Sequence, residues 1–537
     1  MKRIKDPIYG YLEIENEYFK LIDTASFQRL RNIRQTTYQA LYPSSLHNRF
    51  VHSLGVFHLG KKAINHFYRN SKPLFSQRLI EGWRAIEHTF LIACLLHDVG
   101  HSPFSHTGEE YYTKGADLKQ LLSDEIKSSQ FSEDSSSVTW QPHEAMSSLI
   151  GLEICKDSGF EIDKELFVRA ILGLEYKNCD ESAIIINAVI TLLNGQLIDV
   201  DKLDYLSRDS FATGYSSLTI DVDRLLSGYT VCENDKGELC VAYKRGAHSV
   251  IENVIYANDL ERRWIQNHPI ILYDCMLSDF AIRYFNIGMR NVFGTGGKPL
   301  QTVFVKEALT DKGLVNGGSS LRLLCDDDIV HYIKNIASPN HITRQFFSRN
   351  ARLKPLWKTE AAFDNYSRKK LGEDALSKLP EDLRGVLDFL QEHTGFFINE
   401  IALSEAEKAC LAARNESEPL SSSANSYKKV LHICEVFKKF QEGFNLPDFE
   451  FAIVMASKFD TGYRKVKFEK IKVELAQNTV VSLDSLLSVT AREVSLEKPI
   501  PLFYIYTTEN NVQTGEKNGE NLGKEFFNFF KKNYEDA

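Results

Sequence analysis

Residues 92–106 read IACLLHDVGHSPFSH, and this stretch decides how the rest of the sequence is interpreted. The apolar run ends in the adjacent pair His97-Asp98, and His101 and His106 follow. Such a run predicts a buried helix, where a carboxylate is costly unless something neutralises it. A divalent metal would do so, because neutral imidazole and carboxylate both bind it. A core histidine paired with its neighbouring aspartate is the alternative that the stretch alone leaves open.

Composition narrows the class of protein. With 537 residues, 43% hydrophobic and 25% charged, the chain is typical of a globular protein of about three domains. The net charge of −8 argues against a broad nucleic-acid-binding surface, although a local basic pocket for a small polyanion is allowed. The nine cysteines form no CxxC pair, which favours reduced thiols in the cytoplasm.

The apolar segments predict no membrane association. The first ten residues, MKRIKDPIYG, contain no apolar region of the kind found in secretory signals. The longest apolar run, residues 183–193, includes Asn187 and is too short to span a bilayer. We therefore expect a soluble protein located in the cytoplasm.

Two N-terminal segments carry cations. Residues 27–34 combine apolar positions with Arg29, Arg31 and Arg34, which are expected on a solvated helix face or in contact with phosphate. Further on, Arg49 and His52 are three residues apart and would share one face of a helix. A cation beside a candidate metal ligand suits a phosphate-bearing substrate.

Three further segments bear on the site. Residues 123–139 are rich in serine and acidic residues and predict an exposed loop. His143-Glu144 follows at the expected start of a helix, where it is either a proton-transfer pair or a surface pair. In residues 199–209, helical spacing puts several polar side chains on one stripe, which is a polar site wall or a solvated face. These side chains are Asp201, Asp204, Tyr205, Arg208 and Asp209.

The C-terminal part differs in composition. Residues 341–358 form a basic patch, which is a polyanion effector site or a solvated face. Its side chains of interest are Arg344, Arg349, Arg352, Lys354 and Lys358. Beyond residue 440, the segments 451–455, 465–474 and 501–506 predict strands. The sequence thus predicts a mainly α fold with a small C-terminal α/β appendage.

Taken together, the motifs resemble one known family. HNRFVH at 47–52, HDVGHSPFSH at 97–106, HE at 143–144 and DVDKLDYLSRD at 199–209 occur in the order found in HD-domain deoxynucleoside triphosphate triphosphohydrolases. These enzymes include bacterial dGTPase-like proteins and the SAM-and-HD-domain enzyme of animals. The resemblance covers residues 5–230 most clearly. We therefore predict a helical HD phosphohydrolase domain over residues 1–360, followed by a helical extension over 361–440 and a small α/β domain over 441–537.

The resemblance also implies roles for individual residues. The metal ligands would be His52, His97, Asp98 and Asp201. The substrate would be bound by Gln35, Arg49, Lys202, Tyr205 and Asp209. The reaction path would be lined by His101, His106, Glu109, His143 and Glu144. The metal would be a divalent or trivalent ion, namely Mn, Mg, Fe, Zn or Ni.

The implied activity is hydrolysis of a dNTP to a deoxynucleoside and triphosphate, with nucleotide regulation and a role in nucleotide-pool control or antiviral defence. Family resemblance also implies a homo-oligomer, as a dimer, tetramer or hexamer. Three positions depart from the family: Thr36 replaces a leucine, Ile265 a tyrosine and Val51 a glutamate. Another HD-superfamily phosphohydrolase or phosphodiesterase, and a non-catalytic nucleotide sensor, are the alternatives.

Overall fold

The computed structural model describes most of the chain, and its ranges fall into two compact units. The described residues are 1–113, 115–177, 180–195, 198–215, 219–294, 297–336, 341–359, 361–367, 370–371, 422–446, 450–455, 471–476, 479–488, 503–508 and 519–534, with isolated positions between 383 and 408 and at 491. Unit 1 comprises Met1–Arg262, Ala281–Asn335 and Gly462–Glu497, and unit 2 comprises Arg263–Phe280, Ile336–Thr461 and Lys498–Ala537.

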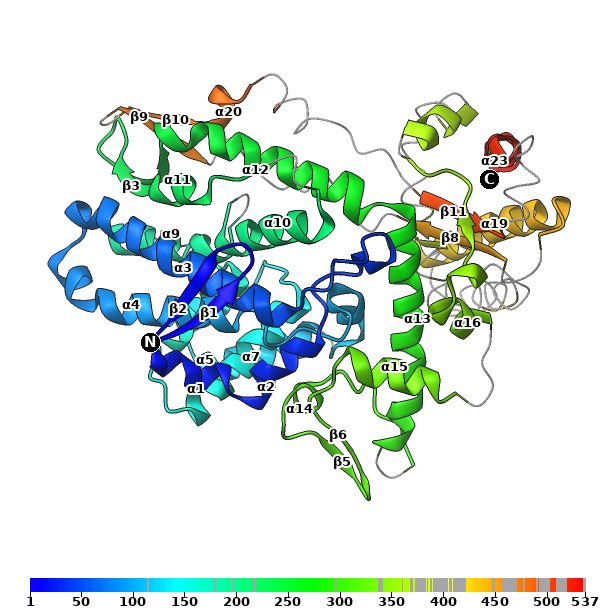
Figure 1. Ribbon diagram of the computed structural model, residues 1–537, viewed down its shortest axis with the longest axis horizontal. Helices are drawn as coiled ribbons and strands as arrows, with labels where there is room; N and C mark the ends of the chain where they lie inside the picture. Colours follow the sequence, from blue (N-terminus) through cyan, green and yellow to red (C-terminus); the bar gives the residue numbers. More distant parts are fainter. Residues whose placement is uncertain are drawn as a thin grey trace. The chain divides into compact units, whose positions relative to one another are not determined.

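Unit 1 is mainly α-helical, as predicted (Figure 1). Its helices are α1 Phe19–Ile22, α2 Ala25–Gln28, α3 Arg49–Ser71, α4 Gln77–Leu96, α5 Gly115–Ile126, α6 Ser129–Ser135, α7 Pro142–Asp157, α8 Lys164–Leu172, α9 Glu181–Leu193, α10 Val200–Thr213, α11 Val222–Ser227, α12 His248–Leu260, α14 Lys306–Leu309 and α15 Asp326–Lys334. A 3₁₀ helix, η5 Ser105–Tyr111, follows the HD pair. The helix α13, Pro269–Val292, contributes residues to both units.

The long helices α3 and α4 pack against each other at the centre of unit 1. Asn48 caps α3 by accepting a hydrogen bond from the backbone N–H of Val51, and Ser76 caps α4 in the same way. Gly60 allows the close approach, since a Cβ added there would lie 2.6 Å from Cys94 Sγ. Helix α10 also packs against α3, so α3 contacts both the helix that leads into the HD pair and the helix that carries the 199–209 motif.

The sheets of unit 1 are small. The strands β1 Lys2–Asp6 and β2 Gly10–Ile14 form an N-terminal hairpin, and Gly10 supplies the positive φ of 81° at its turn. A second sheet has the order β10-β9-β4-β3. Its strands are β3 Tyr229–Glu233, β4 Leu239–Lys244, β9 Lys472–Ala476 and β10 Thr479–Ser482. The strands β5 Leu314–Asn316 and β6 Ser319–Leu321 form a hairpin before α15.

Unit 2 combines a short sheet with helices. The sheet has the order β7-β11-β8, formed by Lys354–Pro355, Phe503–Thr507 and Phe451–Met455. Helices α16 His341–Phe347, α19 Ser422–Gly443 and α23 Gly519–Tyr534 belong to the same unit. Its core is rich in aromatic residues, and Trp357 Nε1 donates to the backbone oxygen of Phe503 at 2.8 Å. The α/β character predicted for this end of the chain is therefore confirmed.

The predicted strands beyond residue 440 are shared between the units. β8 and β11 lie in unit 2, whereas β9 pairs in parallel with β4 in unit 1. Residues 465–470 of the predicted strand lie outside the described residues, as does much of 361–440. The division into domains 1–360, 361–440 and 441–537 therefore stays a prediction.

The prediction of a loop over residues 123–139 is wrong for most of that stretch. Helix α5 continues to Ile126, and α6 spans Ser129–Ser135 with Ser128 as its N-cap. The serines serve as caps and local hydrogen-bonding groups, and Phe131 is fully buried. The buried Asp134 pairs with Arg169 at 2.9 Å, which fixes the segment against α8.

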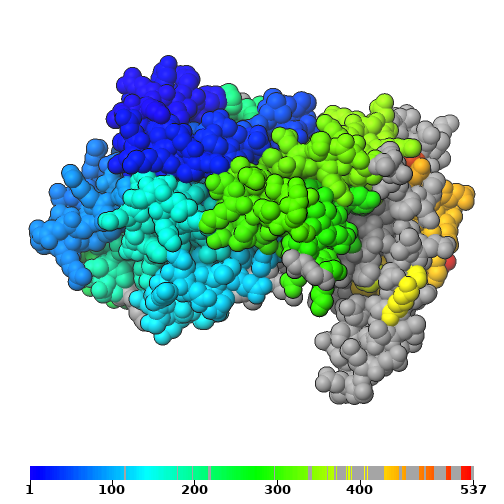
Figure 2. Space-filling model, turned by 90° about the horizontal axis from the view of Figure 1, so that it is seen from below, coloured from blue at the N-terminus to red at the C-terminus, as the bar shows by residue number. Residues whose placement is uncertain are grey.

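The surface view shows how distant segments of unit 1 meet. On the face seen in Figure 2, the dark blue N-terminal segment and the green segment containing α14 and α15 lie side by side. Within the described ranges, no helix combines the length and apolar character needed to cross a bilayer.

Candidate active site

The four predicted metal ligands come together where α3, α4 and α10 meet. His52 Nε2 lies 3.3 Å from His97 Nε2, 3.5 Å from Asp98 Oδ2 and 2.9 Å from Asp201 Oδ1. His97 Nε2 lies 3.5 Å from Asp98 Oδ1 and 3.6 Å from Asp201 Oδ1. His52, His97 and Asp98 offer ligand atoms close enough together to hold one metal ion. Asp201 lies within 3.6 Å of both imidazole Nε2 atoms and is a fourth candidate.

The other ring nitrogens of both histidines have protein partners. His52 Nδ1 lies 2.7 Å from Asp204 Oδ2, and His97 Nδ1 lies 3.0 Å from the backbone oxygen of Cys94. An acceptor at Nδ1 places the proton there and leaves the Nε2 lone pair available to a metal. The donor set and its supporting contacts therefore fit a metal ion.

Asp204 is held in turn by a buried arginine. Arg208 donates from Nε to Asp204 Oδ2 and from Nη2 to Oδ1, both at 2.9 Å, and its Nη1 donates to Asp6 Oδ2 at 3.0 Å. Burial opposes ionisation of Asp204, but Arg208 and His52 lower its pKa to about 2. An ionised carboxylate thus faces His52, and Asp6 at the end of β1 takes part in holding it through Arg208.

Arg49 connects the predicted metal cluster to the loop after it. Its Nη1 donates to Asp98 Oδ2 at 2.7 Å, and its Nε donates to Ser105 Oγ at 3.0 Å. Burial raises the pKa of Asp98, but Arg49 and His97 bring it well below its usual range. The predicted phosphate-binding arginine therefore lies beside the predicted metal ligands, as the three-residue spacing to His52 suggested.

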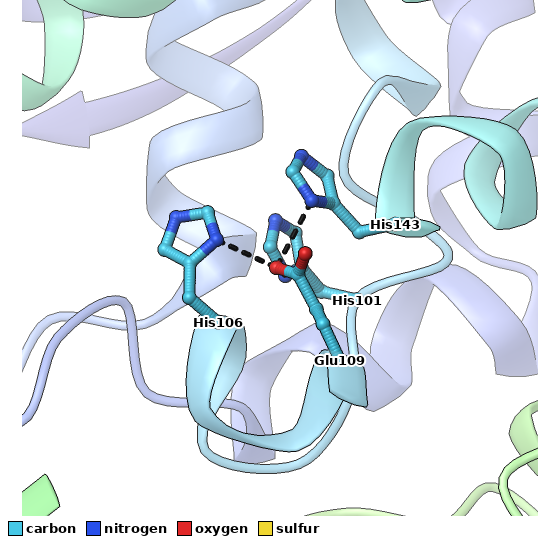
Figure 3. Close-up of side chains that lie close together, drawn as sticks. All are labelled: His101, His106, Glu109 and His143. Carbon is cyan, nitrogen blue, oxygen red and sulfur yellow. Dashed lines mark hydrogen bonds and ion pairs between the residues drawn. The ribbon is translucent and has the colours of Figure 1, made fainter. Parts of the chain in front are cut away.

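A second polar group lies next to the first and contains four of the five predicted reaction-path residues. Figure 3 shows that the rings of His101, His106 and His143 surround the carboxylate of Glu109. Glu109 Oε1 lies 2.6 Å from His106 Nδ1, 3.0 Å from His143 Nδ1 and 3.7 Å from His101 Nδ1. His101 also lies 3.1 Å from Asp98 through its Nε2, which links the two groups.

The pKa values of the two histidines nearest Glu109 are shifted in opposite directions, although Glu109 raises both. Partial desolvation by the surrounding protein lowers the pKa of His106 despite the carboxylate, although 62% of its side-chain surface is exposed. For His143 burial also favours the neutral ring, but Glu109 and Glu144 raise its pKa above the ordinary value. Of the two, His143 is therefore the better proton donor near neutral pH.

The pairing of His143 with Glu144, considered from the sequence, is wrong. Glu144 is the third residue of α7 and accepts a hydrogen bond from the backbone N–H of Gln141, forming a capping box. Its other oxygen accepts from Asn194 Nδ2 at 2.9 Å. The carboxylate that contacts His143 is instead Glu109, from η5.

Of the predicted substrate residues other than Arg49, Lys202 and Tyr205 lie on α10, and Gln35 precedes α3. Lys202 Nζ donates to Asp199 Oδ2, and it also donates to the backbone oxygen of Gly195 at 2.9 Å. Tyr205 is half-buried on the same helix. Gln35 is buried, and its side-chain oxygen has no hydrogen-bond partner among the described residues. A buried acceptor without a partner is costly and is compatible with a bound ligand.

Asp209 belongs to a buried hydrogen-bonded chain that the sequence did not reveal. Its Oδ1 lies 2.6 Å from His47 Nε2, and its carboxyl group is hydrogen-bonded to Glu261. Glu261 Oε1 accepts from the Tyr38 hydroxyl at 2.6 Å. Burial raises the pKa of Asp209 to about 7, and burial together with the neighbouring Asp209 raises the pKa of Glu261 well above its usual range.

The three departures from the family occupy different environments. Thr36 is half-buried, and its hydroxyl has no hydrogen-bond partner within the described ranges. Val51 is half-buried in the first turn of α3, one residue before His52. Ile265 is buried, with 2% of its surface exposed, and belongs to unit 2.

The basic segment 341–358 lies in unit 2 and is less uniform than its sequence. Arg344, Arg349 and Lys358 are exposed, and Lys354 is half-buried. Arg352 pairs with Asp274 at 2.7 Å, so its charge is neutralised within unit 2. The effector site stays a prediction.

Residues 49–186 match the HD domain family. The chain is 32% identical over 229 residues to a Dictyostelium discoideum protein named deoxynucleoside triphosphate triphosphohydrolase SAMHD1 homolog, covering 42% of this chain and 39% of that protein. It is 30% identical over 255 residues to the uncharacterized protein MG461 of Mycoplasma genitalium, covering 47% and 52%. The resemblance inferred from the motifs is therefore confirmed.

The fold of the whole chain also has a counterpart. A crystal structure of a hypothetical protein from Aquifex aeolicus superposes with a TM-score of 0.52 at 20% identity, covering 98% of this chain and 99% of that one. At this identity the likeness concerns the fold alone. The chain spans about half the length of the curated relatives it matches.

Proposed function

We propose that this chain is a metal-dependent phosphohydrolase that cleaves a deoxynucleoside triphosphate into deoxynucleoside and triphosphate. The proposal rests on two adjacent groups of side chains. In the first, the Nε2 atoms of His52 and His97 lie within 3.6 Å of each other and of carboxylate oxygens of Asp98 and Asp201. The second consists of three histidines around Glu109. The HD domain and the named relative support a hydrolase acting on a nucleotide.

The proposed ligands are His52, His97, Asp98 and Asp201, and the ion's identity is open. A metal bound there would polarise a phosphate oxygen and lower the pKa of a water molecule. Arg49 would offset the negative charge of the phosphates while it holds Asp98 in place. Lys202 would contribute a second positive charge from α10.

The reaction needs a proton at the leaving oxygen. Water adds to the α-phosphorus, the bond from that phosphorus to the 5′-oxygen of the sugar breaks, and the 5′-oxygen takes up a proton. We assign this proton to His143 or His106, with Glu109 fixing both rings through Nδ1. Between them, His143 is favoured because its pKa is raised.

Product identity tests the proposal. The full chain would be incubated with each dNTP and NTP in Mn²⁺ or Mg²⁺, and the products separated by ion-exchange chromatography. Release of triphosphate and a nucleoside supports the proposal, with His97→Ala as the inactive control. Release of monophosphate or pyrophosphate would instead support another HD-superfamily phosphohydrolase, and no turnover with retained nucleotide binding would support a sensor.

Assembly and regulation form a separate part of the proposal. The family resemblance supports a homo-oligomer whose assembly responds to a nucleotide, with the exposed cations Arg344, Arg349 and Lys358 as the effector contacts. Light scattering of the purified chain with and without each nucleotide would test this part independently of turnover.

A further inference from the structure

The loop between the HD pair and η5 has an unusual backbone. Phe104 and Ser105 are consecutive non-glycine residues with φ angles of 57° and 54°. This left-handed conformation costs an L-residue of the order of 1–2 kcal/mol. Such strain persists only where surrounding contacts over-determine the backbone, and it concentrates at functional sites.

Asp326, the first residue of α15, supplies one of these contacts. Its Oδ1 accepts a hydrogen bond from the backbone N–H of Phe104 at 2.7 Å, and its Oδ2 accepts from the backbone N–H of Arg34 at 3.1 Å. Only 3% of its surface is exposed. One buried carboxylate thus joins three segments that are far apart in sequence.

Arg29 holds the same loop from the same region of the chain. Its Nη2 donates to the backbone oxygens of Val99 and His101, at 3.0 and 2.8 Å, and its Nη1 donates to the backbone oxygen of Leu324 at 2.7 Å. Arg29 is 3% exposed, so the expectation of a solvated or phosphate-binding arginine is wrong at this position. Its guanidinium bridges residues 99–101 to the segment just before α15.

From the strained loop the contacts lead directly to the proposed active site. The Ser105 hydroxyl donates to the backbone oxygen of Arg34 and accepts from Arg49 Nε at 3.0 Å, and Arg49 contacts Asp98. His101 and His106 lie on either side of the strained pair. A shift of the loop would therefore displace Arg49 and both histidines, without touching the ligands on α3 and α10.

We infer that Asp326 is a positioning residue: with Arg29, it holds residues 99–106 in a strained conformation that sets His101, His106 and Arg49 for catalysis. This inference rests on the proposed function for its catalytic part. The holding of the loop itself is independent of any substrate.

Asp326→Asn tests it, because the amide keeps the size but can accept at only one of the two positions. Asp327→Asn is the matched control, since Asp327 is exposed in the same first turn of α15. The first readout is amide hydrogen exchange over residues 98–106. Loss of a buried charged acceptor should increase exchange at Phe104 by about tenfold or more, with metal content unchanged.

The second readout is steady-state hydrolysis of whichever nucleotide the wild type cleaves. Asp326→Asn should lower kcat by about a hundredfold with KM nearly unchanged, because a misplacement of about 1 Å acts on the chemical step. If Asp326 only stabilised the fold, Asp326→Asn would lower Tm and the fraction of folded, active protein. After correction for that fraction, kcat would then equal the wild-type value, as KM would. Arg29→Lys provides a second variant, with the same expected pattern.

The exchange and kinetic results for Asp326→Asn and Asp327→Asn together test the inference. Faster exchange and reduced kcat in Asp326→Asn, absent from Asp327→Asn, supports the inference. Exchange equal in the two variants, or faster exchange with kcat retained, overturns it. If the wild type cleaves no nucleotide, the proposed function fails, and exchange alone decides whether Asp326 holds the loop.

Discussion

Replacing Gly55 by alanine should loosen the proposed metal centre without altering any ligand. Gly55 lies on α3, where an added Cβ would be 1.9 Å from Asp204 Oδ1 and 2.6 Å from Arg208 Nη2. A Cβ atom essentially never lies closer than 3.0 Å to another non-bonded heavy atom, so the Asp204 carboxylate oxygen must move from 1.9 Å to at least that distance. The movement breaks its alignment with His52 Nδ1, now 2.7 Å away.

The size of the effect follows from the contacts that Asp204 makes. Loss of a carboxylate that orients a ligating histidine typically weakens metal binding by about 10–100-fold. Disrupting the buried pair with Arg208 should destabilise the fold by about 3–5 kcal/mol. The higher helix propensity of alanine offsets about 1 kcal/mol of that, which leaves a net loss of about 2–4 kcal/mol.

Gly82→Ala is the matched control, because Gly82 lies within α4 and a Cβ there would meet nothing within 4 Å. It should raise stability by about 0.5–1 kcal/mol and leave metal affinity unchanged. Chelator competition measures metal affinity, and Tm from calorimetry compares stability. If Gly55→Ala binds metal as tightly as Gly82→Ala and has the same Tm, the role given to Asp204 is refuted.

Three further predictions concern ligands, sugar selectivity and regulation. Asp98→Ala should purify without the metal that elemental analysis finds in the wild type, because it removes a proposed ligand and the partner of Arg49. A metal content equal to that of the wild type would refute Asp98 as a ligand. Thr36→Leu should raise the ratio of kcat/KM for dNTP over NTP about tenfold, because it removes a hydroxyl partner; an unchanged ratio would place selectivity elsewhere. Arg344→Glu should reduce activation by a second nucleotide at constant metal content, and a wild type with no such activation would contradict the effector site.

The helical framework and the neighbourhood of the proposed ligands were accessible from the sequence. Periodicity defined α3, α4 and α10, and the three-residue spacing of Arg49 and His52 correctly put both on one face of a helix. Because burial of the His97-Asp98 pair is costly, a metal ion was the expected partner of this pair. Long helices with strong caps are predictable because their determinants are local.

Pairings across the fold were not accessible in the same way. His143 and Glu144 are adjacent, which suggested a dyad, but Pro142 at the start of α7 and Glu144 two residues later form a capping arrangement. That signal was present in the sequence and competes directly with the dyad. The actual partner, Glu109, lies on a separate 3₁₀ helix whose position depends on tertiary contacts.

The role of Asp326 could not be predicted from the residues around it in the sequence. Three aspartates open α15, and their common explanation is a favourable interaction with the helix N-terminus. Only Asp326 among the three is buried and bonded to Phe104 and Arg34. A phenylalanine and a serine in left-handed conformation carry no sequence signal, because glycine is the usual residue there. Their conformation is therefore imposed from outside the loop, and a site built on such strain depends on a residue that no motif near the site can reveal.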